Sequence, residues 1–121
     1  MERIINLTQH PATPEQKEAG VLDLEGESLL MLQELLTFND IPTEKELMLR
    51  SSQIALIAKS RLANKAMIGG APFFMVFMHM ALLREGITPV YAFSRRESIE
   101  EIQPDGTVKK LSIFKHIGFV E

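Results

Sequence analysis

Cysteine is absent from the 121 residues of the chain. Without it the protein cannot form disulfides, thiolate zinc sites, iron–sulfur clusters or a cysteine nucleophile, and this composition fits a reducing cytoplasm. An excess of positive charge is also absent, since 13 basic residues face 16 acidic ones, for a net charge of -3. This balance disfavours generic binding to double-stranded nucleic acid or to an anionic membrane. Any anion site must therefore be a local pocket.

Long apolar runs are missing as well. The most apolar stretch, residues 71–83, contains His79 and is shorter than the roughly 20 residues that span a bilayer. Residues 1–10 lack the apolar segment of a secretion signal. We therefore expect a cytoplasmic protein with no membrane contact.

Several familiar motifs are absent. The chain contains no G-x-G-x-x-G, no G-x-x-x-x-G-K-[ST] and no G-x-S-x-G, which excludes the dinucleotide fingerprint, the Walker P-loop and the nucleophile elbow. Its three histidines, His10, His79 and His116, lack the i, i+4 or H-x-E spacing of metal ligands. We expect no metal and no cofactor.

The composition that remains is that of a globular protein, with 45% hydrophobic and 24% charged residues. A single domain spanning residues 1–121 is predicted, with roughly 6,600 Å² of accessible surface if it is compact. A capping box marks one helix start, with Thr13 as the N-cap, Pro14 at the first helical position and Gln16 closing the box.

Helical and strand patterns alternate along the chain. Strands are predicted at residues 3–7, 21–24, 65–68 and 87–93, and helices at 14–20, 28–36, 43–62 and 71–85. A hairpin is predicted from residues 98–102 and 107–114, closed around Pro104, Asp105 and Gly106. Strands separated by helices predict parallel pairing. The expected fold is α/β, a small Rossmann-like three-layer domain with a mostly parallel sheet and a C-terminal antiparallel hairpin; an α+β sandwich is the alternative.

Three predicted strand ends carry polar or glycine residues. The candidate ligand-binding residues are Asn6, Thr8 and Gln9 after the first strand, Gly69 and Gly70 after the third, and Ser94, Arg95 and Arg96 after the fourth. Ligands of open α/β sheets bind at the carboxyl ends of the strands. We expect the three ends to converge on one hollow.

Each of these residues has a ligand-binding and a purely structural interpretation. The paired glycines would let a ligand approach backbone N–H groups at a helix start, or would only form a tight turn. Arg95 or Arg96 would hold phosphate or carboxylate, or would pair with nearby glutamates on the surface. His10 would bind phosphate or act as the catalytic acid or base, or would bond to backbone. Ser94 fits hydrogen bonding better than nucleophilic attack.

Helix 71–85 is apolar on nearly every side, so more than one of its faces must be covered. Burial in the core is one interpretation. A homodimer interface is the other, since methionine and phenylalanine are enriched in interfaces.

The segment Ile5-Asn6-Leu7-Thr8-Gln9-His10-Pro11, followed by Thr13-Pro14-Glu15-Gln16, resembles the start of small CRISPR-associated Rossmann-like proteins related to CARF domains. Some members of that group bind or cleave cyclic oligoadenylates and are called ring nucleases. The resemblance covers about 16 residues. It implies that His10, Gly70 and Arg95 surround a cyclic nucleotide.

Three functions follow as hypotheses. The first is binding of a nucleotide or another phosphate-bearing ligand, without catalysis. The second is a ring nuclease or phosphodiesterase with His10 as acid or base. Since the first hypothesis involves no catalysis, the sequence leaves open whether the protein is an enzyme. The third is a homodimeric interaction module in which the polar strand ends play no part.

Overall fold

The computed structural model describes residues 3–121. The strands are β1 (Ile4–Asn6), β2 (Val21–Asp23), β3 (Lys65–Met67), β4 (Thr88–Ile102) and β5 (Val108–Val120). The helices are α1 (Pro14–Glu18), α2 (Gly26–Leu36), α3 (Glu44–Ser60) and α4 (Pro72–Arg84). Every predicted helix is present, within a few residues of its expected ends.

The five strands form one sheet in the order β2-β1-β3-β4-β5. The pairs β1–β2, β1–β3 and β3–β4 are parallel, and β4–β5 is antiparallel. The predicted α/β class, with a mostly parallel sheet and a C-terminal antiparallel pair, is confirmed.

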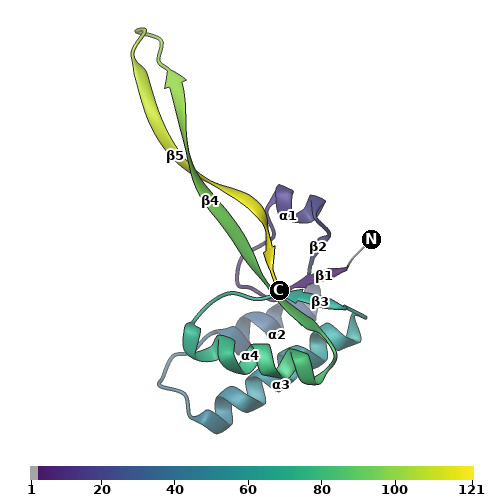
Figure 1. Ribbon diagram of the computed structural model, residues 1–121. Coiled ribbons are helices and arrows are strands. Elements are labelled where there is room, and N and C mark those ends of the chain that lie inside the picture. Colours follow the sequence, from purple (N-terminus) through teal and green to yellow (C-terminus); the bar gives the residue numbers. More distant parts are fainter. Residues whose placement is uncertain (1–2) are drawn as a thin grey trace.

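The two faces of the sheet are covered unequally. Figure 1 shows α2, α3 and α4 on one side and the short α1 on the other. The larger core lies under the three helices, where Phe74, Met78 and Leu82 of α4 are almost completely buried in one cluster with sheet residues such as Ile5. The opposite face holds a small cluster, Ile4, Ala12, Val21, Met67 and Val90, against which Phe119 packs.

Local sequence signals account for the helix starts. The Thr13 hydroxyl accepts a hydrogen bond from the Gln16 N–H, and the Gln16 side chain accepts one from the Thr13 N–H, as the capping box predicted. Thr43 caps α3 by accepting from the Glu46 N–H. These caps satisfy backbone donors that a helix start otherwise leaves unpaired.

Strand β4 differs most from the sequence prediction. A strand ending at Phe93, with a polar exit at residues 94–97, was expected, but β4 continues to Ile102. Strand β5 pairs with it along this whole extension, with a register irregularity at Phe93/Ser94. Figure 1 shows the two strands leaving the body of the protein as a long projecting ribbon. The prediction is wrong because β5 supplies backbone partners to a polar segment that reads as a loop.

The predicted turn at the tip of this ribbon is confirmed. Gly106 adopts a φ of 85°, and its N–H donates to the Gln103 carbonyl at 2.9 Å. The Asp105 carboxylate accepts from both the N–H and the hydroxyl of Thr107. A glycine is needed here because a side chain disfavours positive φ.

His116 in β5 lacks hydrogen-bond partners. Both of its ring nitrogens are buried with no partner among the described residues, while its ring meets Phe119 edge to face at 4.9 Å. We expect His116→Phe to raise the free energy of unfolding by about 1 kcal/mol, because it removes unsatisfied polar atoms and keeps the aromatic contact. Urea unfolding measures this difference.

His79 provides the matched control. Its Nδ1 lies 2.9 Å from the Tyr91 hydroxyl, so His79→Phe breaks a hydrogen bond and should lower the free energy of unfolding by about 1 kcal/mol. Equal effects of the two substitutions would contradict the difference in hydrogen bonding.

Candidate functional site

A hollow of about 450 Å³ lies at the carboxyl ends of β1 and β3. Its lining consists of polar loop residues, glycines and the start of the long strand: Thr8, Gln9, His10, Pro11, Thr13, Gln16, Met67, Ile68, Gly69, Gly70, Tyr91 and Ala92. Five predicted site residues are therefore brought together, from two of the three predicted strand ends. We call this hollow the rim pocket.

Asn6 shapes the loop that forms one wall of the rim pocket. Its side-chain amide donates to the His10 carbonyl and to the Asp23 carboxylate, both at 2.8 Å. Its side-chain oxygen accepts from the N–H and the hydroxyl of Thr8, at 2.9 and 2.7 Å. Asp23 also accepts from the Ala12 N–H at 3.0 Å. Asn6 was predicted to bind a ligand, but these four hydrogen bonds fill its capacity and make it a residue that positions the loop.

The paired glycines after β3 also line the rim pocket. Gly70 has a φ of 151°, a conformation that side chains rarely adopt, and an added Cβ there would lie 3.6 Å from Met75 Cε. A Cβ on Gly69 would lie 3.8 Å from Thr8 Cγ2 and meet only ordinary contact. The turn therefore requires glycine at position 70 and favours it less strongly at position 69.

Helix α4 begins directly after these glycines without a side-chain cap. Its N-cap is Ala71 and its first residue is Pro72. Within residues 3–121, no acceptor is found for the backbone N–H groups of Gly69, Gly70 and Ala71. Uncapped N–H groups at a helix start, together with the helix dipole, favour an anion.

The two remaining loop candidates, Gln9 and His10, differ in whether their side chains already make hydrogen bonds within the protein. Gln9 donates from its side-chain amide to the Leu36 carbonyl at the end of α2, at 3.3 Å, so it joins the loop to that helix. The His10 side chain is exposed, and its imidazole makes no hydrogen bond to any described residue. His10 is therefore available to a ligand, whereas Gln9 is partly committed.

Tyr91 and His79 form a pair beside the rim pocket. The Tyr91 hydroxyl lies 2.9 Å from His79 Nδ1, and the two rings stack with centroids 6.0 Å apart. Burial raises the pKa of Tyr91 above its usual value of 10.0. Among the predicted site residues neither member of this pair appears, although Tyr91 is the only tyrosine and lies near the end of a predicted strand.

Ser94, Arg95 and Arg96 lie outside the rim pocket, and their predicted convergence with the other two strand ends is wrong. They occupy the ribbon formed by β4 and β5 (Figure 1). Arg95 lies 4.0 Å from the Glu97 carboxylate, and the Arg96 guanidinium lies 5.2 Å from the centre of the Phe114 ring. The surface alternative for these arginines is therefore the one observed.

The rim pocket contains no lysine or arginine in its lining. Across residues 3–121, no group of three or more His, Asp or Glu side chains is placed to hold a metal ion. A ligand in this pocket would meet backbone N–H groups, hydroxyls, one imidazole and one phenol. These groups bind and orient polar ligands by hydrogen bonding.

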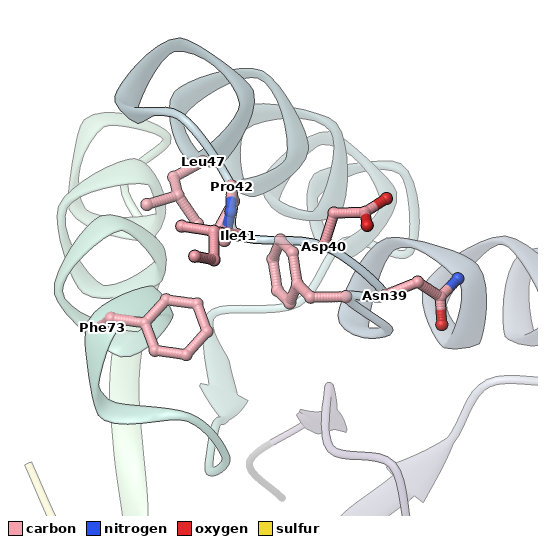
Figure 2. A pocket seen from close by; sticks show the side chains of 7 residues that line it. Asn39, Asp40, Ile41, Pro42, Leu47 and Phe73 are labelled. Carbon is pink, nitrogen blue, oxygen red and sulfur yellow. The ribbon is translucent and has the colours of Figure 1, made fainter.

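A second hollow, of about 830 Å³, lies where the α2–α3 loop meets the start of α4. Phe38 lines it, and Figure 2 shows the ring of Phe73 and the side chains of Ile41 and Leu47 gathered around it. Asp40 is its one charged lining residue. Because this hollow is mostly apolar and offers Asp40 as its single ionisable lining group, the rim pocket is the better candidate for chemistry.

The described residues include no helix that could cross a membrane. A comparison with known protein families matches residues 2–120 to a family described as "Uncharacterized protein MJ1673 family". No curated protein and no solved structure matches the chain.

Proposed function

We propose that this chain, which belongs to the MJ1673 family, is a cytoplasmic domain that binds a nucleotide or another phosphate-bearing ligand in the rim pocket. The observation that carries the proposal is the position of the pocket in the sheet. The chain leaves β1 through α1 toward β2, and it leaves β3 through α4 toward β4, on the opposite face of the sheet.

The loops after β1 and β3 therefore diverge at a topological switch point. In doubly wound α/β sheets, including those with the order 2-1-3-4, ligands bind in the crevice that such a divergence opens. The rim pocket is lined by residues of these two loops, among them His10 and Gly70. The sheet topology therefore supports a ligand site at this position. The unpaired N–H groups at the start of α4 add hydrogen-bond donors that can bind an anion.

The N–H groups of Gly69, Gly70 and Ala71 would bind the phosphate, and His10 would reach it from the loop after β1. With no arginine or lysine in the lining, the site favours a ligand of low charge held largely by backbone. A phosphodiester fits this description better than a phosphate monoester, since it carries a single negative charge.

Binding of a defined probe tests the proposal. We expect a cyclic dinucleotide or cyclic tetra-adenylate to raise the melting temperature of the wild-type protein. His10→Ala and Gly70→Ala should each weaken binding about tenfold, by removing one contact or by distorting the turn. Isothermal titration measures the affinity.

Arg95→Ala is the matched control, because Arg95 lies in the ribbon away from the rim pocket. Its affinity for the probe should equal that of the wild type. If Arg95→Ala weakens binding and His10→Ala does not, the site has been misplaced.

An enzyme of the ring-nuclease or phosphodiesterase kind is the second candidate. The unpaired imidazole of His10 favours it, since a histidine at the pocket wall could move a proton during cleavage of a phosphodiester. Product analysis after incubation with linear and cyclic oligoadenylates distinguishes the two. Tight binding without turnover supports a binding protein.

An interaction module built on helix 71–85 is the third candidate. Four apolar side chains of α4 are about half exposed or more, namely Phe73, Val76, Met80 and Leu83. Their spacing places them along one side of the helix. This stripe supports contact with another protein, and the homodimer expected through this helix stays a prediction.

A further inference from the structure

The ribbon of β4 and β5 leaves unusual amounts of surface uncovered. The chain exposes 8172 Å², about a quarter more than the roughly 6,600 Å² expected for a compact protein of its mass. Apolar side chains on the ribbon are 40% to 78% exposed: Phe93, Ile99, Ile102, Val108, Ile113, Phe114, Ile117 and Val120. An isolated two-stranded ribbon is marginally stable in water, so a partner on this ribbon would stabilise it.

One edge of β4 is free over most of its length. Strand β3 pairs with β4 only from Thr88 to Val90, and beyond that point β5 occupies the other side. The backbone groups on the free side of residues 91–102 therefore have no strand neighbour within the described chain. Such an edge is a template for pairing with a further strand.

The charges along β4 specify which strand fits this edge. Two arginines, Arg95 and Arg96, precede Ser98, and two glutamates, Glu100 and Glu101, follow it at the same distances. If two copies of β4 pair antiparallel around Ser98, Arg96 lies opposite Glu100 of the second copy and Arg95 lies opposite Glu101. Side chains directly opposite one another share a face of the sheet, so all four contacts that the symmetry generates join opposite charges.

Other arrangements lose this complementarity. A shift of one residue in one direction places Glu97 opposite Glu100 of the second copy. A shift in the other direction leaves Arg95 opposite Glu100 as the only kind of arginine–glutamate pair. Strand β5 carries Lys109, Lys110 and Lys115 and no acidic residue, so its own edge would repel a second β5. Only the β4 edge is complementary to itself.

We propose that the protein forms a homodimer in which the β4 edges of two copies pair antiparallel around Ser98, joining two ribbons into a four-stranded sheet. A contact that each copy makes with the same surface closes on itself and gives a dimer. The excess exposed surface, about 1,600 Å², is about twice the roughly 800 Å² that each partner buries in a stable interface. The α4 stripe offers no such register and does not specify a second copy.

Single cysteines test the register, because the natural chain has none. Ser98→Cys places two thiols directly opposite each other at the symmetry axis, within the distance that a disulfide bridges. Oxidation should therefore convert it to a covalent dimer. Ser112→Cys is the matched control: Ser112 lies opposite Ser98 within the same ribbon, and the two copies of Ser112 would be about three strand spacings apart, roughly 14 Å, too far to bridge.

Charge reversal tests the contacts. Wild type should be dimeric at micromolar concentration in sedimentation equilibrium. Arg95→Glu with Arg96→Glu should raise the dimer dissociation constant at least about 100-fold, and so should Glu100→Arg with Glu101→Arg, because like charges then face each other. An equimolar mixture of the two double variants should form a heterodimer, since every charge contact between the two copies again joins opposite charges. Association also shows that both variants are folded, including Glu100→Arg with Glu101→Arg, whose new side chains lie opposite Lys110 and Lys109 of β5.

Three results would overturn the proposal. The first is a wild-type monomer at 100-fold higher concentration, the second is equal cross-linking by Ser98→Cys and Ser112→Cys, and the third is failure of the mixed variants to associate. Val76→Lys with Met80→Lys alters only the exposed side of α4 and should leave the dimer intact. If it gives a monomer, the interface lies on α4 instead.

Discussion

Phe74→Ala is expected to lower the free energy of unfolding by about 4 kcal/mol, the cost of deleting a fully buried aromatic ring. Phe74 is 1% exposed and lies at the centre of the larger core, with its ring 5.2 Å from that of Phe38. A loss of this size corresponds to roughly 15 °C in melting temperature for a domain of this length. Urea unfolding gives the free energy directly.

Phe73→Ala is the control, one residue away on the same helix. Phe73 also contacts Phe38, at 5.5 Å, but its side chain is half exposed. Its truncation should cost about 1 kcal/mol, since much of the ring already meets water. If the two substitutions lower the free energy of unfolding by the same amount, Phe74 does not lie at the centre of the core.

Asn6→Ala should lower the free energy of unfolding by about 3 kcal/mol, although it removes only a small polar group. Asn6 is buried, and its loss leaves the Thr8 N–H, the His10 carbonyl and the Asp23 carboxylate each without one partner. The loop that carries His10 should then open. Hydrogen exchange of the Thr8 and Ala12 amides should accelerate, because both depend on this network.

Thr8→Val tests whether Thr8 and Asn6 stabilise the loop through one shared hydrogen-bond network. It removes the hydroxyl that donates to the Asn6 side chain and keeps the shape of the residue, so its cost should be about 1 kcal/mol. In the double variant the two costs should not add, since the hydroxyl contact is lost only once. Strict additivity would show that the two residues act independently.

Local signals in the sequence predicted most of the fold. The cap at Thr13 and the glycines after β3 each act over a few neighbouring residues, so their structural effect is readable without knowledge of the rest. They correctly placed the helix starts and brought His10 and Gly70 to the same edge of the sheet.

Contacts between distant segments could not be read in this way. The structural role of Asn6 depends on its hydrogen bond to Asp23, 17 residues further along the chain. Nothing in the sequence near Asn6 indicates this partner. Likewise, Arg95 and Arg96 follow a buried strand and resemble its exit, yet Lys115 and Phe114 lie opposite them in β5. A strand that is exposed on both faces has no hydrophobic alternation to reveal it.

The register irregularity at Phe93/Ser94 separates two parts of the same strands. On the body side of the irregularity Phe119 lies opposite Ala92 and packs against the smaller cluster, whereas beyond it Phe114 lies opposite Arg96 in the ribbon. Removing one residue from each ribbon strand would shorten the arm without moving any core side chain. The length of the arm and the shape of the rim pocket are therefore free to diverge independently during evolution.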